Sequence, residues 1–250
     1  MADRIQGANR GVTLPAQSIY EESSTALHKL GTRLVIGERT FFYCKNGAVA
    51  LTAGLVVAAI NTLTSEDTVT VAHGIGTYDV TVTASGIAAN DFAEGWLVVD
   101  EGTGVGTTYK IRSNTATVSG VIVCTLYDPL AVAWATADTD VTLTPSIYNA
   151  VVVSPTAGVS LPVGVPLIGV TASYYFWAQT WGPCGVKMDV SDGGGNSIDE
   201  RVLMPSPDHA GQIIVDDTPT ADHMPVGFII ITAADHGDNK TEPIFLNLAR

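Results

Sequence analysis

TVTVAHGIGTYDVTVTASG, residues 68–86, is the stretch that best indicates the fold class of this chain. Threonine alternates with valine on both sides of a glycine-containing break, and in an extended strand such neighbours point to opposite faces. The valine face can pack on a core while the threonine hydroxyls face water. The same pattern, bounded by Gly, Asn, Asp or Pro, recurs in GWLVVDEG (95–102), TYKIRSN (108–114), VSGVIVCTLYD (118–128), DVTLTPS (140–146) and YNAVVVSP (148–155). It predicts an all-β fold with antiparallel sandwich or barrel-like domains and little helix.

Two turn signals predict tight hairpins: Asn46-Gly47, and the glycine-rich run 102–106 between two of these strands. Residues 16–30 carry some helical pattern, but they also contain the weak helix formers of the run SST at 23–25. A helix and an extended N-terminal arm therefore fit this segment equally well.

Three prolines, Pro155, Pro162 and Pro166, punctuate residues 154–166. Proline cannot donate to a strand ladder, so this stretch is predicted to be a connector or an edge rather than a central strand. The predicted organisation has three parts. They are an arm with the first strand (1–45), a β domain (46–153), and a second β region with the aromatic strand and the C-terminal strands (154–250).

The overall composition excludes several classes of function. The chain has 250 residues, of which only 15% are charged, and 12 basic against 25 acidic side chains give a net charge of −13. Such an acidic protein is not expected to bind nucleic acid or a membrane surface. The apolar run 48–60 is too short to span a bilayer, and MADRIQGANR (1–10) lacks the apolar core of a signal peptide. The three cysteines are too widely spaced for a zinc site, so they are predicted to be buried small hydrophobes.

Charge is unevenly distributed along the chain. Residues 1–45 hold six basic and four acidic side chains, whereas residues 46–250 hold six and 21. A mildly basic arm ahead of an acidic body suggests that the arm docks on a partner while the body faces water, although chance variation in a solvated terminus also explains the difference.

No catalytic, metal or cofactor site is predicted. EGTGVGTTYK (101–110) lacks the Lys-Ser or Lys-Thr of a phosphate loop and is followed by a strand pattern instead of a helix. The pairs Asp208-His209, Asp222-His223 and Asp235-His236 could bind a divalent metal, but each lies in turn-forming sequence. SDGGGNSIDE (191–200) could likewise bind calcium, but its sequence favours a flexible surface loop.

The densest unusual feature is SYYFWAQTWGPCGV, residues 173–186, in a chain that is only 7% aromatic. In a strand, Tyr174 and Phe176 share one face while Tyr175 and Trp177 share the other, so both faces must be covered. The second face could enter the same core, pack on a neighbouring subunit, or stack on a sugar ring.

LHKLGTRLVIGERTFFYCKNGAVALTAGLVV (27–57), followed by VGVPLIGVTASYYFWAQTWGPCGVKMD (163–189), resembles capsid decoration (cement) proteins and related minor structural proteins of tailed bacteriophages. The resemblance is one of pattern, and the rest of the chain matches only in being rich in β pattern, Thr and Gly. Decoration proteins lie on the outer surface of the head, often as trimers, and brace neighbouring capsomers without catalysing a reaction.

The resemblance implies a virion protein that is made in the host cytoplasm and placed on the outer capsid surface. Its expected partners are the major capsid protein and two further copies of itself in a homotrimer. The arm residues expected to contact the capsid are Arg4, Arg10, Arg33 and Arg39. Those expected to pack between subunits are Tyr175, Trp177 and Trp181. The alternative is a tail or fibre protein that uses these aromatic residues to bind host glycans.

Overall fold

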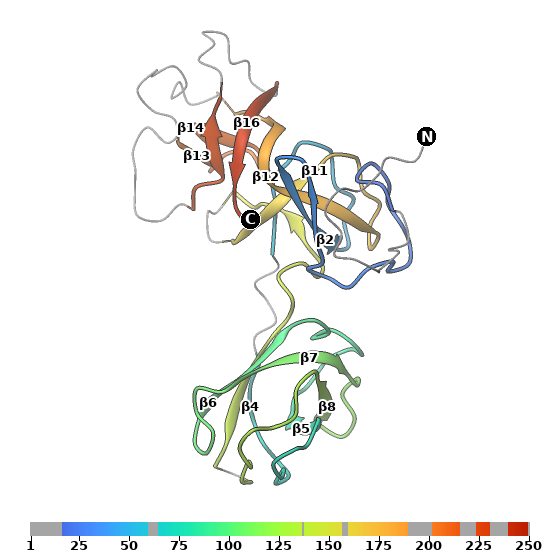
Figure 1. The fold of residues 1–250 in the computed structure, drawn as a ribbon, viewed down its shortest axis with the longest axis vertical. Helices are drawn as coiled ribbons and strands as arrows, with labels where there is room; N and C mark the ends of the chain where they lie inside the picture. Colours follow the sequence, from blue (N-terminus) through green and yellow to red (C-terminus); the bar gives the residue numbers. More distant parts are fainter. Residues whose placement is uncertain are drawn as a thin grey trace. The chain divides into compact units, whose positions relative to one another are not determined.

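The computed structural model describes residues 17–59, 65–136, 138–156, 160–189, 202–215, 224–230 and 240–249, with the side chains of 65–67 excepted. The chain divides into two compact units (Figure 1). The first unit combines residues 1–60 with residues 147–250, and the second unit is the insertion 61–146. The expected division after residues 45 and 153 is therefore corrected. The N-terminal and C-terminal regions belong to one unit because their strands pair with each other.

The first unit contains one ten-stranded sheet in which every strand ladder is antiparallel. Its main path has the order β10-β3-β11-β12-β16-β15-β13-β14, and β2 joins β1 to β12. The strands are β1 (Arg33–Ile36), β2 (Arg39–Lys45), β3 (Val57–Ala58), β10 (Val152–Val153), β11 (Pro162–Pro166), β12 (Tyr175–Lys187), β13 (Val202–Pro205), β14 (Ile213–Val215), β15 (Gly227–Ile229) and β16 (Thr241–Asn247).

β12 is the central strand of this sheet, and it carries the aromatic segment. Its first half pairs with β2, with Trp177 opposite Tyr43, and its second half pairs with β16. Phe176 and Ala178 enter one core cluster, and Trp177 enters another with Phe41 and Tyr43. Each fully buried large side chain of this kind stabilises the fold by about 1.5–3 kcal/mol. The sequence expectation that both faces of this strand are covered is thus confirmed.

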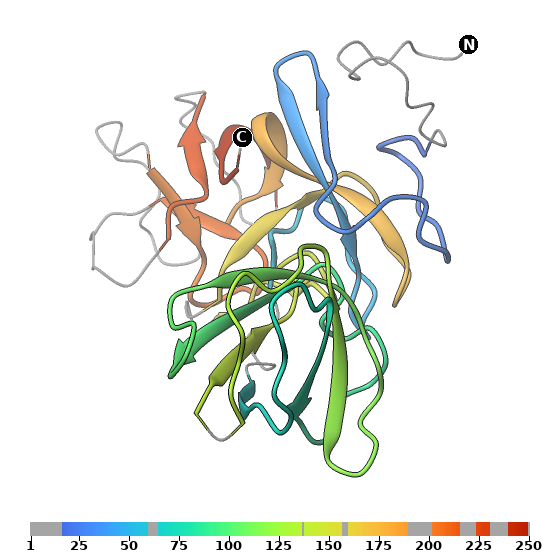
Figure 2. The ribbon, with the colours of Figure 1, turned by 60° about the horizontal axis from the view of Figure 1, so that its bottom comes forward.

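The second unit is a six-stranded antiparallel sheet in the order β4-β9-β6-β7-β8-β5. Its strands are β4 (Ser65–Thr68), β5 (Asp79–Thr83), β6 (Trp96–Glu101), β7 (Thr108–Asn114), β8 (Val121–Leu126) and β9 (Asp140–Thr144). The sheet curls around a single apolar core, and Val69 beyond β4 pairs with Val82 of β5. This contact brings the two edge strands together, which leaves few unpaired edge groups. Figure 2 shows the curled sheet from below.

The all-β fold with little helix is confirmed. The described residues contain no helix, and residues 17–30 in particular contain none, so nothing in the described ranges resembles a membrane-crossing helix. The glycine-rich run 102–106 does join two paired strands, β6 and β7, as expected.

Two local expectations are corrected. Asn46-Gly47 is not a hairpin, because β2 pairs with β12 and Asn46 is a buried corner whose side-chain amide donates to the carbonyls of Val49 and Thr171, both at 2.9 Å. β11 is an internal strand with all five residues buried, not an edge. Its prolines stand at its two ends, and the pairing register shifts between Pro162 and Gly164, so few ladder bonds are lost.

Candidate functional site

Residues 17–32 form a segment of turns and bends, here called the strap, that crosses β2 and β12. Ser23 and Tyr175 exchange two backbone hydrogen bonds of 2.8 and 2.9 Å. The Glu22 carboxylate accepts the backbone N–H of Thr171 at 2.6 Å and its hydroxyl at 2.8 Å. These bonds, from both backbone and side chains, hold the strap on the body through one isolated β-bridge and side-chain contacts.

The strap covers a cluster of aromatic rings. The Trp177 indole lies 5.0 Å from both Tyr43 and His28 between ring centroids. Trp177 Nε1 donates to the Gln17 carbonyl at 3.2 Å, and the Tyr43 hydroxyl donates to Gln17 Oε1 at 2.7 Å. Burial raises the pKa of Tyr43 above its ordinary value, so the hydroxyl stays protonated and keeps this bond. The cluster thus fastens the strap to the core.

The three residues predicted to pack between subunits have different surroundings. Trp177 is only 2% exposed, because the strap of the same chain covers it. It is therefore unavailable to a neighbouring subunit or a glycan, and that part of the prediction is corrected. Tyr175 and Trp181 are half-buried, and Trp181 places its ring edge-on to Phe245 at 5.3 Å. Their role between subunits stays a prediction.

The predicted capsid-contact arginines lie partly within the described residues. Arg33 is exposed at the start of β1, and Arg39 begins β2 across the hairpin. Arg39 holds its guanidinium carbon 5.3 Å from the Phe41 ring centre and lines a shallow hollow of about 300 Å³ beside Tyr20. Arg4 and Arg10 lie outside the described residues. One end of the strap is therefore followed by a hairpin with two cations.

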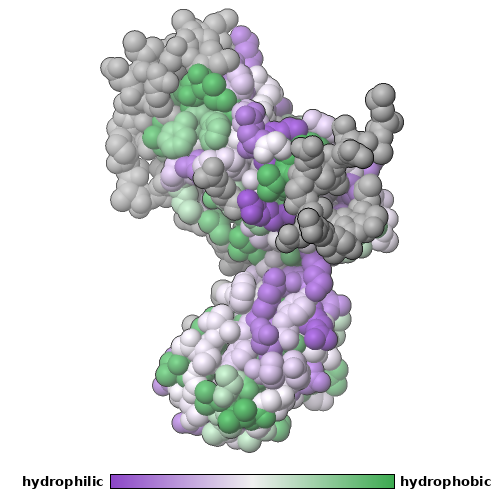
Figure 3. Space-filling view, in the orientation of Figure 1, coloured by the Kyte–Doolittle hydropathy of each residue, from purple (hydrophilic) through white to green (hydrophobic). Residues whose placement is uncertain are grey.

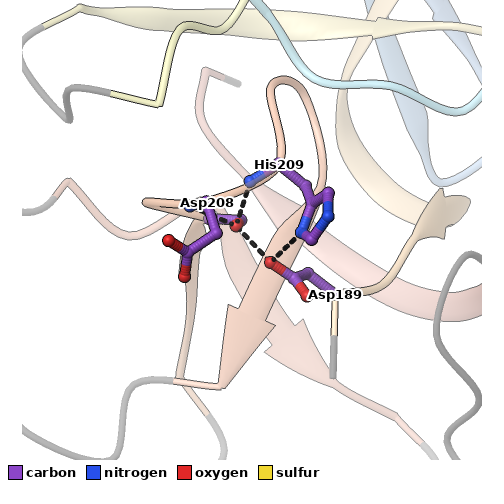
Figure 4. Close-up of polar contacts among 4 residues, drawn as sticks. Asp189, Asp208 and His209 are labelled. Carbon is purple, nitrogen blue, oxygen red and sulfur yellow. Dashed lines mark hydrogen bonds and ion pairs between the residues drawn. The ribbon is translucent and has the colours of Figure 1, made fainter. Parts of the chain in front are cut away.

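One of the Asp-His pairs belongs to a buried polar cluster (Figure 4). His209 Nδ1 lies 3.0 Å from Oδ2 of Asp189, whose side chain is fully buried. The Ser206 hydroxyl donates to the same oxygen and accepts the backbone N–H groups of Asp208 at 3.0 Å and His209 at 2.9 Å. In Figure 4 the Asp208 carboxylate points away from this cluster. The cluster closes the turn after β13 and ties it to the end of β12.

This geometry differs from a nucleophile triad, in which the serine hydroxyl donates to an imidazole that a carboxylate orients. Here the Ser206 hydroxyl donates to the Asp189 carboxylate and accepts two backbone N–H groups, while the His209 ring contacts Asp189. Among the described residues, no group of three His, Cys, Asp or Glu side chains could hold a metal. Asp222-His223, Asp235-His236 and the loop 191–200 lie outside the described ranges. Of the three predicted Asp-His pairs, the structure thus places His209 of one pair in contact with the buried Asp189 carboxylate.

Removing the Ser206 hydroxyl should destabilise the first unit. Ser206→Ala removes the hydroxyl that donates to Asp189 Oδ2, and it leaves two backbone N–H groups without their acceptor. The free energy of unfolding should therefore fall by about 1–3 kcal/mol. Urea unfolding followed by circular dichroism measures this change. Asp208→Ala in the same turn is the matched control and should change stability by less than about 0.5 kcal/mol. Equal effects of the two substitutions would contradict the structural role of the cluster.

The cysteines behave as the sequence predicts. Cys44, Cys124 and Cys184 are buried free thiols. Burial raises the pKa of Cys184 to about 12, partly opposed by the nearby Arg39, and also raises that of Cys44. Both thiols are therefore protonated at neutral pH, which suits packing and not nucleophilic chemistry.

Two surfaces of the second unit were missed by the sequence reasoning. One is an apolar end, where segments after β4, between β6 and β7, and before β9 expose Val71, Ile75, Val105 and Val132. Figure 3 shows hydrophobic side chains gathered at this end. The other is the outer face of β6 and β7, where Trp96 stands beside Lys110. The alternation in WLVVDE was the available signal, since it separates Trp96 from Leu97, but it does not say which of the two is buried.

Comparison with known proteins does not assign the chain to a family. No family model, curated protein or solved structure matches it.

Proposed function

We propose that the chain is a structural protein of a tailed-phage virion that decorates the outer surface of the head and bridges capsomers. The observation that carries the proposal is the strap. It is hydrogen-bonded to the body and leads into the β1–β2 hairpin, which carries Arg33 and Arg39. Such an arm can lie along a neighbouring subunit while the body faces solvent.

One further feature supports this role. The exposed valines and isoleucine at the end of the second unit form an apolar surface of the kind that marks protein contacts. A chain with both an arm and an apolar end can touch more than one capsomer, and several weak contacts on one lattice combine into strong attachment. Bridging by multivalent attachment would raise the barrier to shell rupture without any chemistry in the protein.

The experiment is reattachment of the purified chain to phage heads that lack it, followed by sedimentation. Reversing the four arm charges (Arg4→Glu, Arg10→Glu, Arg33→Glu and Arg39→Glu together) should abolish occupancy, because contacts with an acidic surface become repulsive. Far-UV circular dichroism should show that the body stays folded. Lys187→Glu on β12 is the control outside the arm and should retain occupancy. Undiminished occupancy of the fourfold variant would refute the arm's role.

The aromatic surface that suggested the tail-fibre alternative is not fully exposed. It required the rings of the aromatic segment to be available for sugars, and Trp177 at its centre is covered by the strap. Nothing about these residues favours the alternative over head decoration.

A further inference from the structure

Four side chains form a row on the outer face of the second unit's sheet. Trp96 of β6 stands directly opposite Lys110 of β7 in the pairing register. The N–H of Tyr127 donates to the Lys110 carbonyl at 2.9 Å, so Tyr127 continues the row on the other side, and Arg112 follows two residues along β7. The intervening residues of β6 and β7 face the core, which fixes this face as the outer one. Trp96, Lys110, Arg112 and Tyr127 are here called the Trp96 face.

Rings and cations alternate along the Trp96 face. Lys110 Nζ lies 5.7 Å from the Trp96 ring centre and 6.0 Å from that of Tyr127, and the guanidinium carbon of Arg112 lies 5.5 Å from Tyr127. Each cation is therefore within range of an attractive interaction with an aromatic ring. Glu94 fixes the middle of the row, because its carboxylate accepts the Tyr127 hydroxyl and lies 3.2 Å from Lys110 Nζ. The row is thus ordered before any ligand arrives, which lowers the entropic cost of binding.

Glu94 holds this position at a conformational cost. Its φ is +60°, in the left-handed region that disfavours residues other than glycine and asparagine. A glycine would avoid the strain but could not supply the carboxylate that holds Lys110 and Tyr127. Backbone strain of this kind accompanies binding sites more often than ordinary surface.

The charge of the Trp96 face is opposite to that of its unit. Residues 61–146 hold two basic and ten acidic side chains, a difference of −8, and both basic residues are in this row. Lys110 is paired with Glu94, whereas Arg112 makes no ion pair among the described residues. The Trp96 ring is 46% exposed next to them. A partly exposed indole near a guanidinium that makes no ion pair among the described residues is complementary to a flat ligand that carries a carboxylate.

We propose that the Trp96 face binds acidic saccharides, chains of pyranose rings that carry carboxylates. The polarised C–H bonds on one side of a sugar ring can stack on the electron-rich indole of Trp96. The Arg112 guanidinium can donate two parallel hydrogen bonds to a carboxylate. A single-stranded nucleic acid also offers flat rings and negative charge, and its tighter binding is one of the outcomes of the test below. This site shares no residue with the arm proposed to contact the capsid.

The test is calorimetric titration of the full chain with tetragalacturonic acid. Maltotetraose supplies pyranose rings without charge, tetra-aspartate supplies carboxylates without rings, and an oligothymidylate represents single-stranded nucleic acid. Binding of tetragalacturonic acid should be the tightest of the four and should weaken as salt rises, since an exposed charge contact is screened. Trp96→Ala and Arg112→Gln should each weaken it by about tenfold or more.

Two matched variants control for nonspecific effects. Phe228→Ala removes an aromatic ring of comparable exposure, 40%, from the first unit, and Lys187→Gln removes a cation from β12. Both should leave the affinity unchanged. Circular dichroism and melting temperature verify folding of each variant, and Arg112→Gln, at an exposed position, keeps the test decisive if Trp96→Ala does not fold.

Several results would overturn the proposal. Absence of tetragalacturonic acid binding at millimolar concentration is one, and equal binding of maltotetraose is another, because charge would then play no part. Equal binding of tetra-aspartate would show that the ring face is not used, and tighter binding of the oligothymidylate would assign the face to nucleic acid. Affinity that survives both Trp96→Ala and Arg112→Gln would place the ligand elsewhere.

Discussion

Trp177→Ala should lower the free energy of unfolding of the first unit by about 3–5 kcal/mol, the range for truncating a buried large aromatic residue. The indole is 2% exposed and packs between Tyr43 and His28. Its Nε1 also donates to the Gln17 carbonyl, so the substitution removes a core ring and an anchor of the strap. Urea unfolding at constant protein concentration, followed by circular dichroism, measures the loss.

Trp181→Ala on the same strand is the matched control. Trp181 is half-buried and contacts Phe245 by its edge, so its truncation should be distinctly less costly. The comparison also separates a core role from an interface role. If Trp177→Ala changed the free energy of unfolding by less than about 1 kcal/mol but dissociated an oligomer, the indole would belong to an intersubunit contact. That result would contradict its burial under the strap of the same chain.

Gly102→Ala should be the most damaging small substitution in the second unit, with a loss of about 2–5 kcal/mol from backbone strain and overpacking together. Gly102 has a φ of +76°, and an added Cβ would lie 1.6 Å from the carbonyl oxygen of Asp138. Since that oxygen belongs to the backbone, the β6–β7 hairpin would have to move away from it. The move would break the bonds that Thr103 makes to Asp138 Oδ2 from its N–H at 3.0 Å and its hydroxyl at 2.5 Å.

Gly106→Ala separates the two causes. Gly106 lies in the same turn with a φ of +86°, but an added Cβ would meet nothing within 4 Å. It should therefore cost only the conformational part, about 1–2 kcal/mol. Thermal unfolding of both variants measures the difference. Equal losses would mean that the close approach of Gly102 to Asp138 does not occur in solution.

Much of the second unit could be predicted from the sequence because its strands alternate strictly. Val80 and Val82 are fully buried while Thr81 and Thr83 are partly exposed, as the Val-Thr pattern predicts. The glycine-rich hairpin between β6 and β7 was predictable for a similar reason, since the turn and the flanking pattern are both local. The candidate site was less predictable. The sequence assigned Arg33 only to the arm, and the covering of Trp177 by residues 17–32 depends on contacts that cross more than a hundred residues.

The sequence by itself determined the main strands of the second unit and which of their side chains share a face, because the two-residue period of an extended chain is a local property. Only the tertiary structure decided which strands pair and which face is buried. Backbone hydrogen bonds are nearly the same for every sequence, so the neighbours of β12, drawn from residues 39–45, 162–166 and 241–247, are selected by the packing of the whole unit. The same packing buries Leu97 and leaves Trp96 in solvent, although either face of that strand is apolar enough to enter a core.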